Sequence, residues 1–329
     1  MLPPGTKIGE WILRKPFPEN DDGTLFEAQN LGSKTLFAAL RVLPATQLGR
    51  PIEECTAILD RLTQVNHPAL ARVIASGDTQ SGAYVFWVRE VVDGEHLGQA
   101  LEKGPMEWSK ACQIAQQLLQ GIQHLHSRGI PHGNIKASNA CIRPDGSARL
   151  LDCALCVDTA PRSLTEMGHR FGTMAYLPPE VLRGEPLDPF RGDVYAMGQL
   201  LCEIIRGVRL FPDSANLSAT QRQSRTLAMK LEAGPMEVGE DAPEALQTLI
   251  RHATNPNPAQ RTVSIEAFSR QLAEVLDDHA MINEAEEEFL DVSQVTLPLK
   301  KSQDQTMRLI WTALAITGTA VGVWTLLGN

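Results

Sequence analysis

The stretch from His132 to Asp152 constrains this chain more than any other part of its sequence. From His132 to Asn139 it reads His-Gly-Asn-Ile-Lys-Ala-Ser-Asn, and Asp152 follows thirteen residues after Asn139. Apolar residues recur at helical spacing between residues 107 and 127, which predicts an amphipathic helix that delivers the chain into this stretch. Asn134 carries an amide, which cannot act as a base near neutral pH.

These residues and their spacing resemble the catalytic loop H-R-D-L-K-P-x-N and the D-F-G motif of protein kinases, in particular bacterial serine/threonine kinases. The resemblance implies an α+β fold of two lobes, a small one with an antiparallel sheet and one helix and a larger, mainly helical one. It implies that Asn139 and Asp152 bind metal and that Lys136 neutralises the transferring phosphate. ATP and magnesium are the cofactors of such a site, and Asn134 replaces its catalytic base.

The first part of the chain resembles the strands of a kinase small lobe but lacks its glycine loop. Runs typical of strands occur at residues 8–15, 23–30 and 36–43. Where the family has G-x-G-x-x-G over the phosphates, only Gly23 matches, so Gly23 is the one candidate cofactor contact here. Pro16 and Pro18 remove backbone donors, and the acidic residues before Gly23 repel phosphate. A plain hairpin is therefore favoured over a nucleotide lid.

Arg41 stands where the family has the lysine of V-A-I-K, which pairs with the nucleotide phosphates and with a glutamate of the next helix. It keeps the charge but replaces a compact ammonium with a wide planar fork. Two interpretations stay open, a contact with bound nucleotide and a solvated surface residue. The next helix is predicted over residues 51–65, where Ile58 fills the position of the pairing glutamate and Glu54 lies one turn earlier.

Glu90 and Val91 stand where the family's hinge meets the adenine ring, at the end of a strand predicted over residues 84–92. Arg89 takes the position before them, from which a side chain points into the back of the nucleotide pocket. Burying an unpaired guanidinium is costly. Arg89 is therefore expected either to find a carboxylate or to occupy the empty pocket.

The residues that hold a kinase fold together match the family closely. Glu180 ends a segment that resembles G-T-x-x-Y-x-A-P-E, and the resemblance implies an ion pair between Glu180 and Arg261. Asp193 begins Asp-Val-Tyr-Ala-Met-Gly, which resembles D-V-W-S-x-G, whose aspartate ties down the catalytic loop. Scaffold positions thus match while transfer positions do not, which is the pattern of a degenerate kinase, or pseudokinase.

Composition divides the chain into four parts. The resemblance covers a small lobe at 1–92 and a large lobe at 93–276, and an acidic and polar linker is predicted at 277–308. Most of the net charge of −9 comes from acidic residues between 274 and 291, so the body is close to neutral. A near-neutral body argues against nucleic acid as a partner.

Residues 309–327 are predicted to cross a membrane as a single helix. They hold no charged residue, and Trp311 and Trp324 lie near the two ends, as interfacial anchors do. Basic residues precede this segment, so the body is expected on the cytoplasmic side of the membrane. Gly318 and Gly322 form a G-x-x-x-G pattern that permits close helix packing, which leaves a homodimer open.

The six cysteines show no disulfide spacing and are expected to be reduced thiols. Cys153 and Cys156 form a C-x-x-C, for which small buried side chains are favoured over a redox or metal site because no second such motif occurs.

Two functions remain as alternatives at this point. The first is a membrane-tethered pseudokinase that acts as a binding, scaffold or regulatory module for a protein partner. The second is a weak or atypical serine/threonine kinase that uses Lys136, Asn139 and Asp152 with metal and ATP on a protein substrate. The sequence identifies neither the partner nor the substrate.

Overall fold

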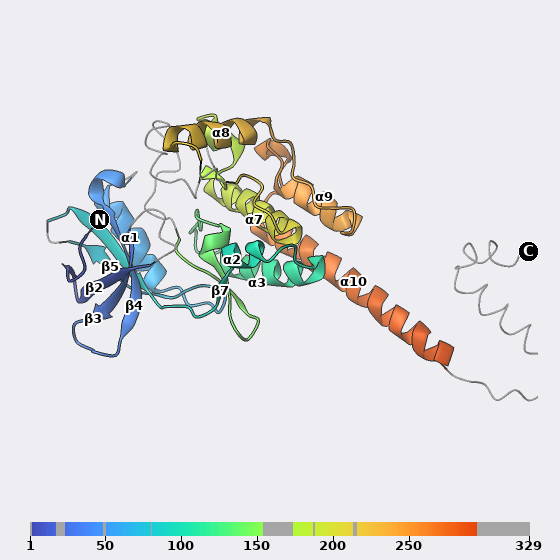
Figure 1. Ribbon diagram of the computed structural model, residues 1–329, viewed down its shortest axis with the longest axis horizontal. Coiled ribbons are helices and arrows are strands. Elements are labelled where there is room, and N and C mark those ends of the chain that lie inside the picture. Colours follow the sequence, from blue (N-terminus) through green and yellow to red (C-terminus); the bar gives the residue numbers. More distant parts are fainter. Residues whose placement is uncertain are drawn as a thin grey trace, which may run out of the picture. The chain divides into compact units, whose positions relative to one another are not determined.

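The computed structural model describes residues 2–17, 24–48, 51–79, 81–153, 174–186, 188–212 and 216–294. The chain divides into two units, Met1–His279 and Ala280–Asn329. The first unit contains a lobe rich in strands, which holds the N-terminus, and a mainly helical lobe (Figure 1). The two-lobed arrangement that the resemblance implies is therefore present in this unit.

The small lobe is built on one antiparallel sheet. Its strands are β1 (Lys7–Ile8), β2 (Trp11–Pro16), β3 (Leu25–Asn30), β4 (Phe37–Pro44), β5 (Val73–Asp78) and β6 (Tyr84–Arg89). Neighbours follow the order β1-β2-β3-β4-β6-β5, so β4 and β6 lie side by side and β5 forms the edge next to β6. The predicted strands are confirmed with two differences: the first is divided, and the strand predicted over residues 84–92 ends at Arg89.

The first predicted strand, 8–15, is divided into a short hairpin. Gly9 has a φ of 54°, a left-handed conformation that glycine adopts without the strain of a side chain. The chain therefore turns back at Gly9, and Ile8 pairs with Trp11 across the turn. A run of strand-forming residues does not reveal such a turn, because one glycine within it is tolerated in an extended strand as well.

The sheet separates two hydrophobic clusters because side chains alternate along each strand. On β6, Phe86 and Val88 belong to a core formed within the sheet lobe. Val85 and Trp87 belong to the main core, which also contains residues of the helical lobe. The alternation places Arg89 on the same face of β6 as Val85 and Trp87, toward the helical lobe.

Helix α1 (Ile52–Thr63) packs against β5 and confirms the predicted helix. Cys55, Leu59 and Leu62 are its buried residues and form the stripe that faces the core. Ile58 is half-buried and packs against that core, whereas the side chain of Glu54 is exposed. The position of the pairing glutamate is therefore apolar, as the sequence indicates.

The large lobe is arranged around two long helices. Its helices are α2 (Leu97–Glu102), α3 (Trp108–His126), α6 (Pro179–Leu182), α7 (Pro189–Arg206), α8 (Ala219–Glu232), α9 (Glu244–Ala253) and α10 (Ile265–Gln294). Short 3-10 turns form η1 (Ala45–Gln47) in the small lobe, and η2 (Ala137–Asn139) and η4 (Pro258–Gln260) in the large lobe. Helices α3 and α7 pack against each other, and the fully buried Leu118 and Leu200 belong to their shared core. This core supports the loop from residue 132 to residue 139.

A second small sheet frames that loop. It joins β7 (Glu95–His96), β8 (Ala140–Ile142) and β9 (Ala148–Leu150) in that order. Strand β8 begins directly after Asn139, and β9 ends two residues before Asp152. The hairpin of β8 and β9 therefore brings Asn139 and Asp152 back to the same end of the sheet.

The linker predicted from residue 277 begins as helix rather than as an irregular segment. Helix α10 continues through this region as far as Gln294. The sequence between Ala280 and Glu288 is rich in alanine and glutamate, which are good helix formers, although it has no regular apolar stripe. Residues 295–308 lie outside the described part of the chain.

The predicted membrane segment at 309–327, with Gly318 and Gly322, also lies outside the described residues. Among the helices that the structure describes, none combines the length and the apolar character needed to cross a bilayer.

Candidate active site at the end of β6 and the loop 132–139

The loop 132–139 is held by a buried carboxylate from α7. Asp193 accepts hydrogen bonds from the backbone N–H groups of His132 (2.7 Å) and Gly133 (2.8 Å). The ring of His126 in α3 lies 2.8 Å from the same carboxylate. Gly133 has a φ of 68°, which lets the loop turn so that both N–H groups face Asp193. The role predicted for Asp193 in fixing this loop is confirmed.

The side chain of Asn134 links the loop to the backbone of Asp152. Its Nδ2 donates a hydrogen bond of 2.9 Å to the backbone carbonyl of Asp152. Asn139 in turn donates from Nδ2 to the backbone carbonyl of Asn134, also at 2.9 Å. A carboxylate at position 134 has no hydrogen to donate and could not make this bond. The amide at this position therefore has a structural use that an aspartate would lack.

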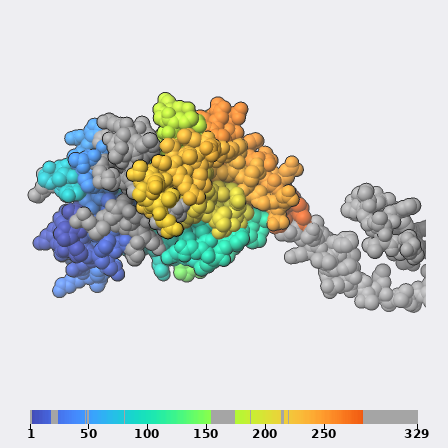
Figure 2. Space-filling model, turned by 45° about the horizontal axis from the view of Figure 1, so that its top comes forward, coloured from blue at the N-terminus to red at the C-terminus, as the bar shows by residue number. Residues whose placement is uncertain are grey.

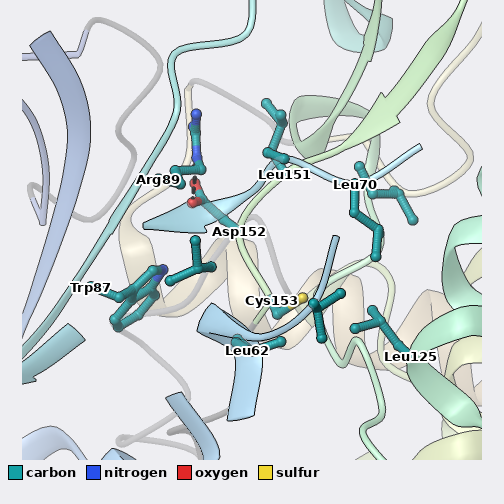
Figure 3. Close-up of a pocket in the computed structure, with 12 residues that line it drawn as sticks. Leu62, Leu70, Trp87, Arg89, Leu125, Leu151, Asp152 and Cys153 are labelled. Carbon is teal, nitrogen blue, oxygen red and sulfur yellow. Dashed lines mark hydrogen bonds and ion pairs between the residues drawn. The ribbon is translucent and has the colours of Figure 1, made fainter. Parts of the chain in front are cut away.

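The side chain of Asp152 is buried between two arginines from the sheet. Arg89 Nε donates to Oδ1 at 2.7 Å, and Arg89 Nη2 lies 3.4 Å from Oδ2. Arg41 Nη2 donates to Oδ2 at 3.0 Å. Figure 3 shows the end of the Arg89 side chain beside the Asp152 carboxylate. Both carboxylate oxygens thus accept bonds from guanidinium groups.

The sheet register explains why both arginines reach one carboxylate. Arg41 on β4 pairs with Trp87, and Arg89 pairs with Ala39. Arg41 and Arg89 are therefore diagonal neighbours on the same face of adjacent strands, within reach of each other's side-chain partners. Sequence reasoning anticipated a carboxylate for Arg89 but missed the pairing of Arg41 with Asp152. The alternation of side chains along the strand could have revealed it, because it places Arg41 on the same face of β4 as the buried Leu43.

The two arginines control the ionisation of Asp152. Burial by itself would raise the pKa of this carboxyl, but the charges of Arg89 and Arg41 and their hydrogen bonds outweigh burial. They hold the pKa of Asp152 well below its usual range. Asp152 also has a φ of 38°, which is uncommon for a residue other than glycine. The carboxylate is therefore charged, oriented and already paired.

Arg89 also contacts the predicted hinge. Its Nη1 donates to the backbone carbonyl of Glu90 at 3.0 Å. The carboxylate of Glu90 binds Arg149 at 2.6 Å and accepts a hydrogen bond of 3.0 Å from the backbone N–H of Arg72. Val91 is exposed, with 48% of its surface accessible to solvent. One guanidinium therefore joins the hinge backbone to Asp152.

The magnesium ion that the kinase resemblance implies does not fit this arrangement of side chains. A divalent cation would bind through the carboxylate oxygens of Asp152, and both already accept bonds from Arg41 or Arg89. A cation at this point would also face two positive charges. Asn139, the second predicted ligand, uses its Nδ2 to bond the loop backbone, which does not engage the Oδ1 that would bind a metal, so the misfit rests on Asp152. In the part of the chain described, no group of three or more metal-ligating residues occurs.

A small cavity lies behind Arg89 and Asp152, between α1 and the sheet. It measures about 20 Å³ and is lined by apolar residues, among them Leu62 and Trp87, and by Cys153 (Figure 3). This volume suits about one water molecule and no larger ligand. Gly23 and Cys156, which the sequence singled out, lie outside the described residues. Lys136 is half-buried in the loop between Asn134 and Asn139.

The framework pair predicted from the sequence is confirmed. Arg261 donates from Nη1 and Nη2 to the two carboxylate oxygens of Glu180, at 2.7 and 2.8 Å. Both side chains are buried, and Arg261 also donates to the backbone carbonyl of Asn255. Paired, parallel bonds of this kind combine charge with fixed geometry. The pair joins the start of α6 to the segment before α10.

The lowered pKa of Asp152 predicts a specific acid response. A carboxyl whose pKa is lower in the folded state stabilises the fold above its unfolded pKa of about 3.9, and this contribution is lost as the pH falls below that value. The difference in unfolding free energy between wild type and Asp152→Asn should therefore be constant from pH 7 to pH 5 and shrink below about pH 4. Urea denaturation measures it, with Asp78→Asn on the exposed end of β5 as control. A difference that shrinks near pH 6 would contradict the assignment.

Comparisons with known proteins identify the family that the loop motifs resemble. A model of the protein kinase domain matches residues 23–272. The chain is 30% identical to the serine/threonine-protein kinase PknL of Mycobacterium tuberculosis over 221 residues, which cover 67% of this chain and 54% of PknL. It is 29% identical to pkn3 of Myxococcus xanthus over 298 residues, which cover 86% of this chain and 53% of pkn3. It therefore spans about half the length of these relatives.

A solved structure shows the same fold. The PknI kinase domain of Mycobacterium tuberculosis, crystallised as a cysteine-to-alanine mutant, superposes with a TM-score of 0.58 and 16% identity. The match covers 84% of this chain and 99% of that domain. At this identity the likeness concerns the fold alone, and it confirms the two-lobed architecture.

Proposed function

This chain belongs to the protein kinase family, and on that basis we propose that it is a membrane-tethered pseudokinase that serves as a binding, scaffold or regulatory module. Protein kinases in general bind ATP and magnesium and transfer phosphate to a protein. The proposal is that this chain keeps the fold and holds the transfer site closed. Its partner is a protein, recognised through the surface of the folded lobes.

One observation carries the proposal, the position of the Arg89 guanidinium. It donates to the hinge carbonyl of Glu90 and to the Asp152 carboxylate at the same time. Those two groups are the ones that the family resemblance assigns to the adenine and to the metal. Since Arg41 binds the second oxygen of Asp152, nucleotide and metal would have to displace two buried ion pairs. Displacing a buried partner is costly because it leaves a charge without compensation.

The loop chemistry supports the same proposal. Loss of a general base typically lowers a rate by about 10²- to 10⁴-fold. Asn134 cannot supply that base, and its amide is committed to the Asp152 carbonyl. Ile58 cannot form the ion pair that a glutamate makes in an assembled kinase site. Each change alone leaves room for activity, and together they favour a fold kept for its shape.

The tethering part of the proposal rests on the sequence of residues 309–327. Their length and lack of charge support a single membrane span, and the basic residues before them support a cytoplasmic body. Gly318 and Gly322 extend the proposal to a homodimer formed within the membrane.

A second candidate function is a weak or atypical serine/threonine kinase. It is favoured by Lys136, Asn139 and Asp152, which all keep the residue types that the family uses at these positions. In that case the arginine pairs would open when magnesium and ATP bind, and phosphate would pass to a protein substrate without a general base.

Phosphate transfer by the purified full chain in detergent distinguishes the two functions. We expect incorporation of radiolabelled phosphate from ATP into a generic protein substrate or into the chain itself to be the same for wild type and Asp152→Ala. We also expect millimolar ATP with magnesium to leave the melting temperature unchanged, since a ligand at about 100 times its Kd would add about 2.7 kcal/mol. Transfer by the wild type that Asp152→Ala abolishes would establish the kinase instead.

A further inference from the structure

Helix α8 is anchored to the large lobe by a buried lysine. Among the α8 residues whose side chains are described, Lys230 alone is buried, and its relative exposure is 0%. The others are exposed or half-buried, and Figure 2 shows α8 at the surface of the face in view, in gold. A helix of this kind usually attaches through an apolar stripe. Here the deepest contact is made by an ammonium group.

The Lys230 ammonium is surrounded by groups that compensate its burial. Its Nζ donates to the backbone carbonyl of Ala175 at 2.6 Å and to Gln199 Oε1 at 2.9 Å. It also lies over two aromatic rings, 4.6 Å from the centroid of Tyr195 and 4.5 Å from that of Phe211. Burial lowers the pKa of the Lys230 amino group well below its usual range, and the charges of Glu203 and Glu180 oppose this shift. The hydrogen bonds and ring contacts also favour the charged form. The lysine therefore occupies a site built for it.

From Lys230 a continuous network of buried hydrogen bonds leads to the loop 132–139. Gln199 Nε2 donates to Glu203 Oε1 at 3.1 Å. The hydroxyl of Tyr176 donates to Glu203 Oε2 and accepts a bond of 3.2 Å from the backbone N–H of Ala137. Ala137 follows Lys136 directly and begins η2, which ends at Asn139. This hydrogen-bond network thus connects a surface helix to the loop residues that the family uses to bind phosphate and metal.

The side chains of this network are buried, so they cannot exchange their hydrogen-bond partners for water. Gln199 and Glu203 are 0% and 1% exposed, and Tyr176 is 6% exposed. Glu203 Oε1 also accepts a bond of 3.0 Å from the backbone N–H of Leu210. Removing one member leaves the next buried group unsatisfied, which costs more than the bond itself contributed. Such a network favours one joint arrangement of its two ends.

We propose that Lys230 is a positioning residue that couples helix α8 to the loop 132–139 through Gln199, Glu203 and Tyr176. A displacement of α8 changes the hydrogen bonding of the Ala137 amide, and a change at the loop alters the packing of α8 on the large lobe. The coupling free energy is the same in both directions, because such energies are reciprocal. The coupling does not depend on whether the protein transfers phosphate, so it stands apart from the function proposed above.

Hydrogen exchange of the full chain tests the coupling from the α8 end. In Lys230→Met, the Ala137 amide should exchange about tenfold faster than in wild type, a change of about 1.4 kcal/mol in the free energy of opening. Arg225→Met, an exposed position of the same helix, should leave Ala137 unchanged. Leu246→Ala, at a buried position of α9, supplies a destabilised variant whose substitution lies outside the hydrogen-bond network. The proposal is overturned if Leu246→Ala, at equal loss of melting temperature, accelerates Ala137 as much as Lys230→Met does.

The reverse test begins at Tyr176, which contacts the loop through the Ala137 amide, and needs only a small change. Tyr176→Phe removes the hydroxyl and keeps the ring, so it should preserve the fold. The amide of Ala233, which caps α8 by donating to the Met229 carbonyl, should then exchange several-fold faster, while amides of α9 keep their wild-type rates. If Tyr176→Phe accelerates Ala137 alone and leaves the end of α8 unchanged, the two ends are independent and the coupling does not exist.

Discussion

Replacing Arg89 with methionine is expected to give the protein a magnesium-dependent response to ATP that the wild type lacks. The substitution removes the guanidinium from Asp152 Oδ1 and from the Glu90 carbonyl and keeps most of the side-chain volume. One carboxylate oxygen then becomes available to a cation, while Arg41 still holds the other. With ATP at about 100 times its Kd, the gain of about 2.7 kcal/mol should raise the melting temperature by roughly 5 °C.

The double variant Arg41→Lys with Arg89→Met should respond more strongly. A lysine at position 41 offers a compact ammonium in place of a guanidinium fork, which frees the second oxygen of Asp152 for a metal. Arg14→Met, on an exposed part of β2, controls for the loss of one positive charge. Thermal shifts with ATP alone, magnesium alone and both together provide the measurement. If neither Arg89 variant responds to the combination, Arg89 does not keep the site closed.

The second large effect concerns the framework and not the candidate site. Glu180→Gln should lower the unfolding free energy by about 3–5 kcal/mol, because it leaves Arg261 buried and charged without its carboxylate. The side chain of Arg261 is 0% exposed and that of Glu180 is 2% exposed. Neither water nor salt can replace the lost partner there. Denaturation in urea and the apparent melting temperature both measure the loss.

Two variants sharpen that measurement. Glu185→Gln removes a carboxylate near the end of α6 that pairs with Arg183, but both side chains are more than one third exposed, so the expected loss is below about 1 kcal/mol. The double variant Glu180→Met with Arg261→Met should recover part of the loss, since two apolar side chains leave no buried charge. Equal losses for Glu180→Gln and Glu185→Gln would show that the buried pair does not hold the lobe.

Local patterns predicted the strands of the small lobe and two of the helices, while the two-lobed fold came from the family resemblance. The strand runs, the helix over residues 51–65 and the helix before His132 all follow from the spacing of apolar residues, which is a local property. The turn at Gly9 and the helical start of the predicted linker were not foreseen. A single glycine fits both a strand and a hairpin turn, and an alanine- and glutamate-rich stretch without a stripe fits both a linker and a helix. In both cases the local signal permits two structures.

The sequence by itself determined which scaffold residues are kept and which transfer residues are replaced. Glu180, Arg261 and Asp193 could be assigned because each belongs to a motif that resembles one of the protein kinase family, whose roles the resemblance carries over. The loss of a base at Asn134 is likewise a matter of residue type. An amide cannot act as a base wherever it lies in the fold, because that property belongs to the side chain itself.

Only the tertiary structure decided what Arg41, Arg89 and Lys230 do. Arg41 is 111 residues from Asp152 and Arg89 is 63 residues from it, and their convergence depends on sheet register and on how the two lobes close. Lys230 belongs to a polar helix, yet its amino group is buried and lies over the rings of Tyr195 and Phe211. The physical reason is common to all three. The cost of burying a charge is set by partners distant in the chain, and only folding brings those partners together.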